Sequence, residues 1–232
     1  MKENIELLGV HRQESYIGCG SAVSRAAINE DCVVFSTSIE STTYLQVLRL
    51  QVSEEMIGED LEASLTSTIR TIITRDNLDS ITSLTLCVVK RLLCAVFTCS
   101  TAGTIELIIQ PLDGSLATTV AVPATCHGGR VQLEEIISLS MSSDNRGALI
   151  VVGGTRNGVL VTLHIDEETL AVVGTSYDQL GLTPVTVRQD EFSKSKVFAT
   201  CDLRVFAVII PFHESPATQN LNQIFLTNAQ NP

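Results

Sequence analysis

Hydrophobic and polar positions alternate along the chain in short runs, and two stretches, 95–116 and 150–170, share one pattern. In both, an apolar run is followed by a small polar turn with glycine, a second apolar run, an acidic turn and a third apolar run. Aligning Gly103 with Gly158 brings these runs into register. Short apolar runs joined by turns predict antiparallel strands. Recurrence after about one blade length predicts a radial repeat architecture such as a β-propeller.

The clearest repeat unit follows the acidic pair Glu134-Glu135. Its four predicted strands cover 136–141, 148–152, 159–165 and 170–176. Asn157-Gly158 separates the second strand from the third and predicts a type I′ hairpin turn, which needs positive φ at both central residues. The third strand alternates, because Val159, Val161, Leu163 and Ile165 fall on one face and Leu160, Thr162 and His164 on the other.

Three further units are predicted around this one. The preceding unit has strands at 81–89, 92–99, 104–110 and 116–122, with turns at Ala102-Gly103 and Asp113-Gly114. Upstream, strands are predicted at 21–28, 32–38, 44–52 and 65–74, and downstream at 184–188, 196–200 and 204–210. The segment 65–74 also has helical spacing of apolar residues, but its threonines favour a strand. The acidic residues between 54 and 62 predict a surface loop.

The predicted fold is therefore all-β, a β-propeller of four-stranded antiparallel blades. It is incomplete, with about four blades over residues 1–212, and the last blade lacks an obvious fourth strand. Residues 213–232 are rich in Asn, Gln, Thr and Pro and predict a polar tail, loop or frayed end. A closed ring of four blades is the alternative, since propellers close with roughly four to eight blades. An open ring predicts self-association or rapid proteolysis of the isolated chain.

The segment Gly153-Gly154-Thr155-Arg156-Asn157-Gly158-Val159-Leu160 resembles part of a known family. After an acidic turn it is followed by Leu180-Gly181-Leu182-Thr183-Pro184-Val185 and by a strand and polar turn at 197–202. An R-N-G hairpin followed by an L-G-x-x-P-V element is similar to the family of the cleavage and polyadenylation specificity factor A subunit, the damaged-DNA-binding protein large subunit and splicing factor 3b subunit 3. The resemblance covers residues 130–210 well, and the upstream units only in style.

The resemblance implies a seven-bladed propeller that acts as a non-enzymatic scaffold in nuclear complexes. Those complexes process RNA or handle damaged DNA. It also implies protein subunits of a nuclear complex as partners, with nucleic acid met only indirectly. The chain departs from the family pattern in length, because 232 residues hold only about half of one such ring.

Composition narrows the function classes. Hydrophobic residues make up 44% of the chain and charged residues 18%, which is enough for a sizeable core. No apolar run approaches the roughly 18 residues of a membrane-spanning helix. The net charge of −11, with scattered Lys and Arg, disfavours direct binding to a nucleic-acid backbone. An acidic surface that meets basic partner proteins is the alternative to a purely solubilising one.

The cysteines and the first residues bear on location. Seven cysteines without regular spacing, mostly within apolar runs, predict reduced core thiols of an intracellular protein. The start of the sequence lacks the apolar stretch of a secretory signal. We therefore expect the nucleus, and also the cytoplasm, as its location.

Few residues suggest chemistry. Cys126-His127 is the only adjacent Cys-His pair, and a zinc site would need two more ligands. Cys94 and Cys99 have the right type, but strand alternation separates their side chains. His164 is predicted to be a hydrogen-bonded residue of a blade face rather than a ligand. The acidic stretch 54–62 lacks the ligand spacing of a calcium loop.

No motif for nucleophilic catalysis or phosphate binding is present. The chain has no G-x-S-x-G elbow, no G-x-x-x-x-G-K-[ST] loop and no G-x-G-x-x-G loop. We therefore predict a non-enzymatic protein-interaction scaffold without catalytic, metal or cofactor residues, whose partner-binding residues the sequence leaves undefined. The alternative is a propeller-based hydrolase or lyase for a small ligand. It would need His, Asp and Glu near the first strands of the blades, which carry almost none.

Overall fold

The structure, a computed structural model, contains strands and turns and no helix in its described part. The described residues are 22–29, 32–39, 42–57, 60–76, 81–101, 104–122, 125–126, 131–143, 147–190, 193–209 and 227–228. The chain divides into two compact units, residues 1–78 and 79–232. No described helix is long and apolar enough to cross a membrane.

The first unit contains one antiparallel sheet in the order β1-β2-β3-β4. Its strands are β1 (Ala22–Ile28), β2 (Cys32–Ile39), β3 (Thr42–Ile57) and β4 (Asp60–Asp76). The prediction of a strand over 65–74 is confirmed. The prediction of an acidic loop over 54–62 is wrong, because β3 and β4 stay paired as far as Ile57 and Asp60. Acidic side chains leave the backbone ladder intact, and Gly58 is the only strong turn former in this stretch.

The second unit contains three four-stranded antiparallel sheets, each in simple meander order. The first consists of β5 (Ile81–Val89), β6 (Leu92–Thr101), β7 (Thr104–Pro111) and β8 (Thr118–Val122). The second consists of β11 (Ile136–Ser143), β12 (Ala148–Thr155), β13 (Val159–Asp166) and β14 (Val172–Gln179). The third consists of β15 (Thr186–Asp190), β16 (Ser193–Cys201), β17 (Arg204–Ile209) and β18 (Thr227–Asn228).

Three short strands were not predicted. The strands β9 (Thr125–Cys126) and β10 (Val131–Gln132) form a two-stranded sheet in the connection between the first two sheets of this unit. The strand β18 pairs with β17 at Phe206 and Ala207 and so provides the fourth strand of the last sheet. Only two residues long and lying in a polar segment, β18 has no hydrophobic alternation by which the sequence could reveal it.

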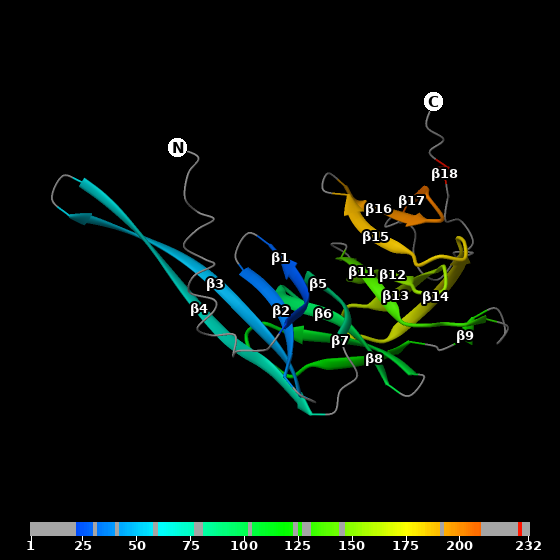
Figure 1. Cartoon of the computed structure of the whole chain (residues 1–232), viewed down its shortest axis with the longest axis horizontal. Coiled ribbons are helices and arrows are strands. Elements are labelled where there is room, and N and C mark those ends of the chain that lie inside the picture. Colours follow the sequence, from blue (N-terminus) through cyan, green and yellow to red (C-terminus); the bar gives the residue numbers. More distant parts are fainter. Residues whose placement is uncertain are drawn as a thin grey trace. The chain divides into compact units, whose positions relative to one another are not determined.

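The three sheets of the second unit lie one after another, as Figure 1 shows. The first strand of the middle sheet, β11, contacts the first strands of both neighbours, β5 and β15. Successive four-stranded meanders whose first strands contact one another are the arrangement of β-propeller blades. The fold class is therefore all-β, with blades of a β-propeller, as the sequence predicts.

Two apolar layers lie between these sheets, one on each face of the middle sheet. The predicted face of Val159, Val161, Leu163 and Ile165 belongs to the layer shared with β5–β8. Leu160, from the opposite face, belongs to the layer shared with β15–β17. The predicted alternation of β13 is therefore confirmed. Both of its faces carry apolar residues because the middle sheet is covered on both sides.

The hairpin turns use two different geometries. The prediction of a type I′ turn at Asn157-Gly158 is wrong, because only Gly158 has positive φ (83°). Three residues, Arg156 to Gly158, connect the strands, which fits a type I turn followed by one left-handed residue. Type I′ geometry occurs instead at Lys90-Arg91 (φ 48° and 66°) and Asp202-Leu203 (φ 49° and 61°). The two-residue length of those loops imposes it, although neither pair contains glycine.

Candidate functional site

The turns between second and third strands lie at the rim where the chain passes from one sheet to the next. In two of the sheets, a side chain from this turn forms hydrogen bonds with the backbone of the segment that leads into the first strand of the same sheet. The side chains are Asn157 and Asp202. Asn157 Nδ2 donates to the carbonyl oxygen of Gln132 at 2.7 Å, and the amide of Glu134 donates to Asn157 Oδ1 at 3.5 Å. The Thr155 hydroxyl donates to Asn157 Oδ1 at 2.8 Å and fixes its orientation.

Asp202 plays the corresponding part in the last sheet. Its carboxylate accepts hydrogen bonds from the amides of Leu182 (3.0 Å) and Thr183 (3.2 Å), and its own amide donates to Thr183 Oγ1 at 3.0 Å. The connection passes so close that a Cβ on Gly181 would lie 1.9 Å from Asp202 Oδ2. Both connections of the described rim are therefore held by side-chain hydrogen bonds.

These hydrogen bonds lower the pKa of Asp202, with the Thr183 side chain as the largest cause and the Leu182 amide as the next. A lowered pKa in the folded protein gives stability that is complete above the unfolded value of about 3.9 and is lost as pH falls through the folded value. We expect Thr183→Val to raise the pKa of Asp202 and to shift acid unfolding to higher pH. Carbon NMR titration of the Asp202 carboxyl measures the first effect, and circular dichroism measures the second. An unchanged Asp202 titration would contradict this role of Thr183.

One open pocket of about 440 Å³ lies at this rim. Its lining includes Ile105, residues 132–135, which precede β11, and Arg156, which forms an ion pair with Glu135 at 2.6 Å. The ion pair is exposed, because the two side chains keep 60% and 37% of their surface in solvent. Exposed pairs contribute little to stability, about 0–1 kcal/mol. The pocket therefore offers a charged rim surface and no enclosed site for chemistry.

The candidate chemical residues do not converge. Among the described residues no group of three His, Cys, Asp or Glu side chains could hold a metal ion. Cys94 belongs to the apolar layer between two sheets and Cys99 does not, as strand alternation predicts. His127 lies outside the described residues, as do the turn Ala102-Gly103 and most of 213–232.

His164 lies on a sheet face, opposite Ile150 on β12 and Gly174 on β14. Its ring is partly buried, and burial lowers its pKa. The position on a blade face is confirmed. No hydrogen-bond partner of His164 is found within the described part of the chain, so the expected hydrogen bond stays a prediction.

The last sheet exposes a face that the sequence analysis did not identify. Cross-strand pairing places eight side chains on the side opposite the buried apolar layer, and we call this side the open face. Its residues are Thr186, Arg188, Lys196, Phe198, Thr200, Val205, Ala207 and Ile209. Val205 and Ile209 keep 42% and 46% of their surface in solvent, and Arg188 is exposed.

The open face occupies positions that are buried in the preceding sheet. Counted from the turn between second and third strands, Phe198 and Val205 correspond to Val152 and Leu160. Val152 and Leu160 are 0% exposed and pack against the sheet β15–β18. The open face therefore has the position of a surface that would be covered by a further sheet.

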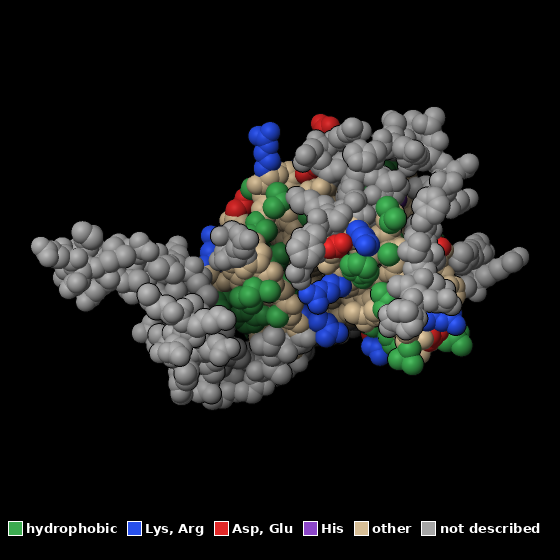
Figure 2. Space-filling model, turned by 90° about the horizontal axis from the view of Figure 1, so that it is seen from above, with side chains coloured by type: hydrophobic (Ala, Val, Ile, Leu, Met, Phe, Trp, Pro, Cys, Tyr) green, Lys and Arg blue, Asp and Glu red, His purple; other side chains and the backbone are tan. Residues whose placement is uncertain are grey.

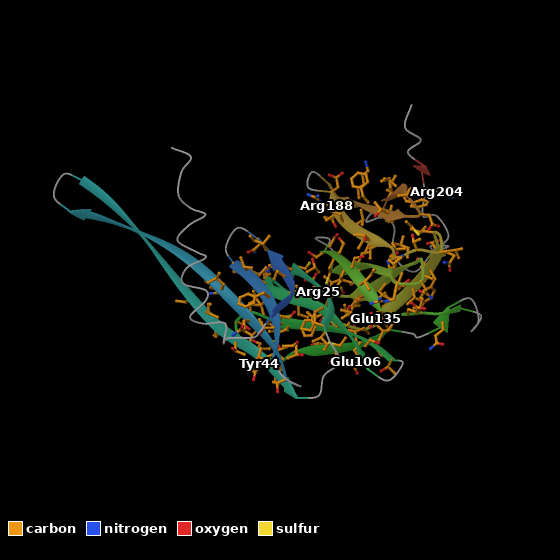
Figure 3. The ribbon with its side chains drawn as sticks, viewed as in Figure 1. Arg25, Tyr44, Glu106, Glu135, Arg188 and Arg204 are labelled. Atoms are coloured by element: carbon orange, nitrogen blue, oxygen red, sulfur yellow. The ribbon has the colours of Figure 1, made fainter. Side chains whose placement is uncertain are left out.

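Basic and apolar groups are combined on the open face. Lys196 Nζ lies 4.8 Å from the centre of the Phe198 ring, a cation–π contact. Figure 3 labels Arg188, the arginine of the open face, on β15. Figure 2 shows hydrophobic side chains in several separate places, with Lys and Arg side chains beside some of them. One sequence signal indicates the face: the run Val205 to Ile209 is apolar at every position, which predicts burial on both faces.

Comparison with known proteins yields structural neighbours only. No protein-family model and no curated protein sequence matches the chain. The β-propeller domain of Cps50 (Swd1) from Myceliophteria thermophila is similar, at 12% identity and a TM-score of 0.44, over 90% of this chain and 71% of that domain. The WD40 domain of coronin from Toxoplasma gondii is similar at 12% identity and a TM-score of 0.30, over 80% of this chain and 66% of that domain. The resemblance of residues 130–210 to the scaffold family stays a prediction.

Proposed function

We propose that this protein is a non-enzymatic protein-interaction scaffold whose main contact surface is the open face of the sheet β15–β18. The observation that carries the proposal is the equivalence of Phe198 and Val205 to Val152 and Leu160, which are fully buried between sheets. An apolar sheet face left in water is unfavourable by about 25 cal/mol per Å² relative to a buried one. A partner that covers this face gains this free energy less the cost of the translational, rotational and side-chain freedom lost on binding.

The partner we propose is a protein surface that is apolar at its centre and acidic around it. Arg188 and Lys196 place positive charge on the open face of a chain whose net charge is −11. Complementary charge steers association and selects among partners. A second copy of this chain is disfavoured, because a two-fold contact would set these basic groups against their own counterparts.

The setting we propose is a nuclear complex that processes RNA or repairs DNA, with the nucleus as the main location. The support is the R-N-G hairpin at Arg156 to Gly158 and the L-G-x-x-P-V element at Leu180 to Val185, which resemble the scaffold family named above. Nucleic acid is proposed as an indirect neighbour only, because the acidic chain lacks the clustered Lys and Arg that displace counterions.

The alternative function, a hydrolase or lyase with a central site, lacks support in the first strands of the sheets. Such a site needs His, Asp or Glu converging where these strands meet. The described strands β5 and β11 contain no residue of these three types, and β15 contains one, Asp190, at its end. We therefore place binding without turnover ahead of catalysis.

Paired substitutions test the proposed contact surface. The tagged full chain is cross-linked in cells and its partners are quantified by mass spectrometry. We expect Val205→Glu with Ile209→Glu to reduce capture of a defined partner about tenfold or more, as expected for central contact residues. The control is Leu116→Glu with Val173→Glu, which changes two exposed residues outside the open face (94% and 60% exposed) in the same way.

The partner should also respond to charge. Arg188→Glu is expected to weaken capture of the same protein, and purified components should bind less tightly at high salt. If the open-face pair captured as much of the partner as the control pair, the open face would be overturned as the contact surface. Failure of the native chain to retain any partner above background, or sedimentation as a dimer that the open-face pair abolishes, would overturn the proposed partner.

A further inference from the structure

Two cysteines face each other across one hairpin. Cys87 on β5 is the direct cross-strand partner of Cys94 on β6, and neither forms a disulfide. Residues directly opposite in an antiparallel pair project their side chains to the same face. Cys94 is part of the apolar layer between the first two sheets of the second unit, and the Cys87 side chain packs against the same layer. The two sulfurs therefore belong to neighbouring positions of one surface.

The pairing register of the hairpin sets the distance between the Cα atoms of Cys87 and Cys94. The turn Lys90-Arg91 makes Val89 and Leu92 the first pair of the hairpin, and Cys87 with Cys94 is the third. In a hairpin with a two-residue loop the first and third pairs are hydrogen-bonded pairs, with Cα atoms about 5.5 Å apart. A disulfide spans Cα separations of about 4.4–6.8 Å. The backbone separation thus permits a bond, while the Cβ atoms must approach slightly, which makes that bond strained and easily reduced.

The two thiols differ in environment. Cys87 is half-buried, whereas Cys94 is 1% exposed. Burial raises the pKa of Cys94 to about 11, so it is almost entirely a thiol at neutral pH. An oxidant in solution therefore reaches Cys87 first, and Cys94 is protected until a reactive sulfur forms beside it.

We propose that Cys87 and Cys94 form a reversible disulfide when the protein meets a peroxide. The Cys87 thiol loses its proton, and the thiolate attacks one oxygen of hydrogen peroxide. The O–O bond breaks, Cys87 becomes a sulfenic acid, and the leaving hydroxide takes the proton lost by the thiol to become water. The Cys94 sulfur then attacks the Cys87 sulfur, the S–O bond breaks, and the leaving hydroxide takes the Cys94 proton to become water. Two thiols are oxidised to one disulfide, and one peroxide is reduced to two waters.

The disulfide would form close to a contact between the sheets β5–β8 and β11–β14. The backbone amide of Lys90, in the turn that joins the two strands, donates to Glu167 Oε1 at 2.5 Å on the turn between β13 and β14. Oxidation draws β5 and β6 together three residues from this amide. We therefore expect hydrogen exchange at Lys90 to change on oxidation, while amides of the third sheet keep their rates.

Peptide mapping tests the proposal. The full chain carrying Cys19→Ser and Cys126→Ser is treated with hydrogen peroxide, alkylated with iodoacetamide and digested with trypsin. Trypsin cleaves after Lys90 and Arg91, so Cys87 and Cys94 fall on separate peptides, 76–90 and 92–130. We expect these peptides to appear as one linked species, two hydrogen atoms lighter than their sum, which dithiothreitol separates.

Matched variants locate the bond. The Cys87→Ser and Cys94→Ala variants are each expected to lose the linked species completely, whereas Cys99→Ser, on the same strand as Cys94, is expected to retain it. Circular dichroism verifies that each variant keeps its strand signal, and Cys87→Ala replaces Cys87→Ser if that variant does not. The proposal is overturned if both thiols remain alkylatable, if Cys87 gains oxygen without linking, if the link maps to Cys99, or if linkage requires urea.

Discussion

Replacing Gly154 with alanine is expected to lower the free energy of unfolding by about 3 kcal/mol, near the upper end of the usual range for overpacked sites. A Cβ at this position would lie 2.2 Å from the carbonyl oxygen of Val185 and 2.6 Å from Ser138 Oγ. The first of these atoms is backbone and cannot rotate away. The same carbonyl accepts a hydrogen bond from Ser138 Oγ at 2.9 Å, so moving it also breaks a contact between two sheets.

The adjacent glycine provides the control. A Cβ on Gly153 would meet the Ile136 side chain, with its nearest atom at 3.1 Å. A side chain can shift by a few tenths of an ångström, and alanine also reduces the entropy of the unfolded chain. We therefore expect Gly153→Ala to change stability by less than about 1 kcal/mol. Urea unfolding followed by circular dichroism measures both variants, and equal stabilities would show that the packing of β15 against β12 is looser than described.

Replacing Leu163 with alanine is expected to lower the free energy of unfolding by about 2–5 kcal/mol. Leu163 is 1% exposed and lies in the apolar layer shared by the sheets β5–β8 and β11–β14. Alanine leaves a cavity that the surrounding strands fill only in part, because backbone pairing holds them in their sheets. Since both sheets line the cavity, they should lose structure in one transition.

Val173 on β14 is the matched position for this test. It is 60% exposed, so Val173→Ala is expected to change stability by no more than about 0.5 kcal/mol. Hydrogen exchange at amides of β6 and of β13 reports the two sheets separately. If Leu163→Ala accelerated exchange in β13 alone, the two sheets would not share one cooperative core.

The strand prediction succeeded where apolar alternation and turn residues coincide. Val159 to Asp166 was predicted to within one residue because four alternate aliphatic side chains lie between an Asn-Gly turn and an acidic turn. The prediction was wrong at 54–62, where charge suggested a loop but backbone pairing continues. It also missed β18, because two paired residues in a polar segment have no pattern of their own.

The candidate surfaces depended on pairing that sequence patterns specify poorly. The open face follows from the pairs Arg188 with Phe198 and Thr200 with Val205, which place residues of three strands side by side. Cys87 and Cys94 face each other because a two-residue turn, Lys90-Arg91, joins their strands, and this turn contains no typical turn former. A change of one residue in either register would move these side chains to the opposite face.

The sequence by itself determined that this protein is all-β, that its strands come in groups of four and which side chains of β13 share a face, because the two-residue period of a strand is a local property. The tertiary structure alone decided which faces are covered and which are left in water. Leu160 and Val205 are both aliphatic residues near the start of a third strand, but Leu160 is 0% exposed under the next sheet and Val205 on the open face is 42% exposed. That difference arises because burial depends on what packs against a strand, which local sequence does not specify.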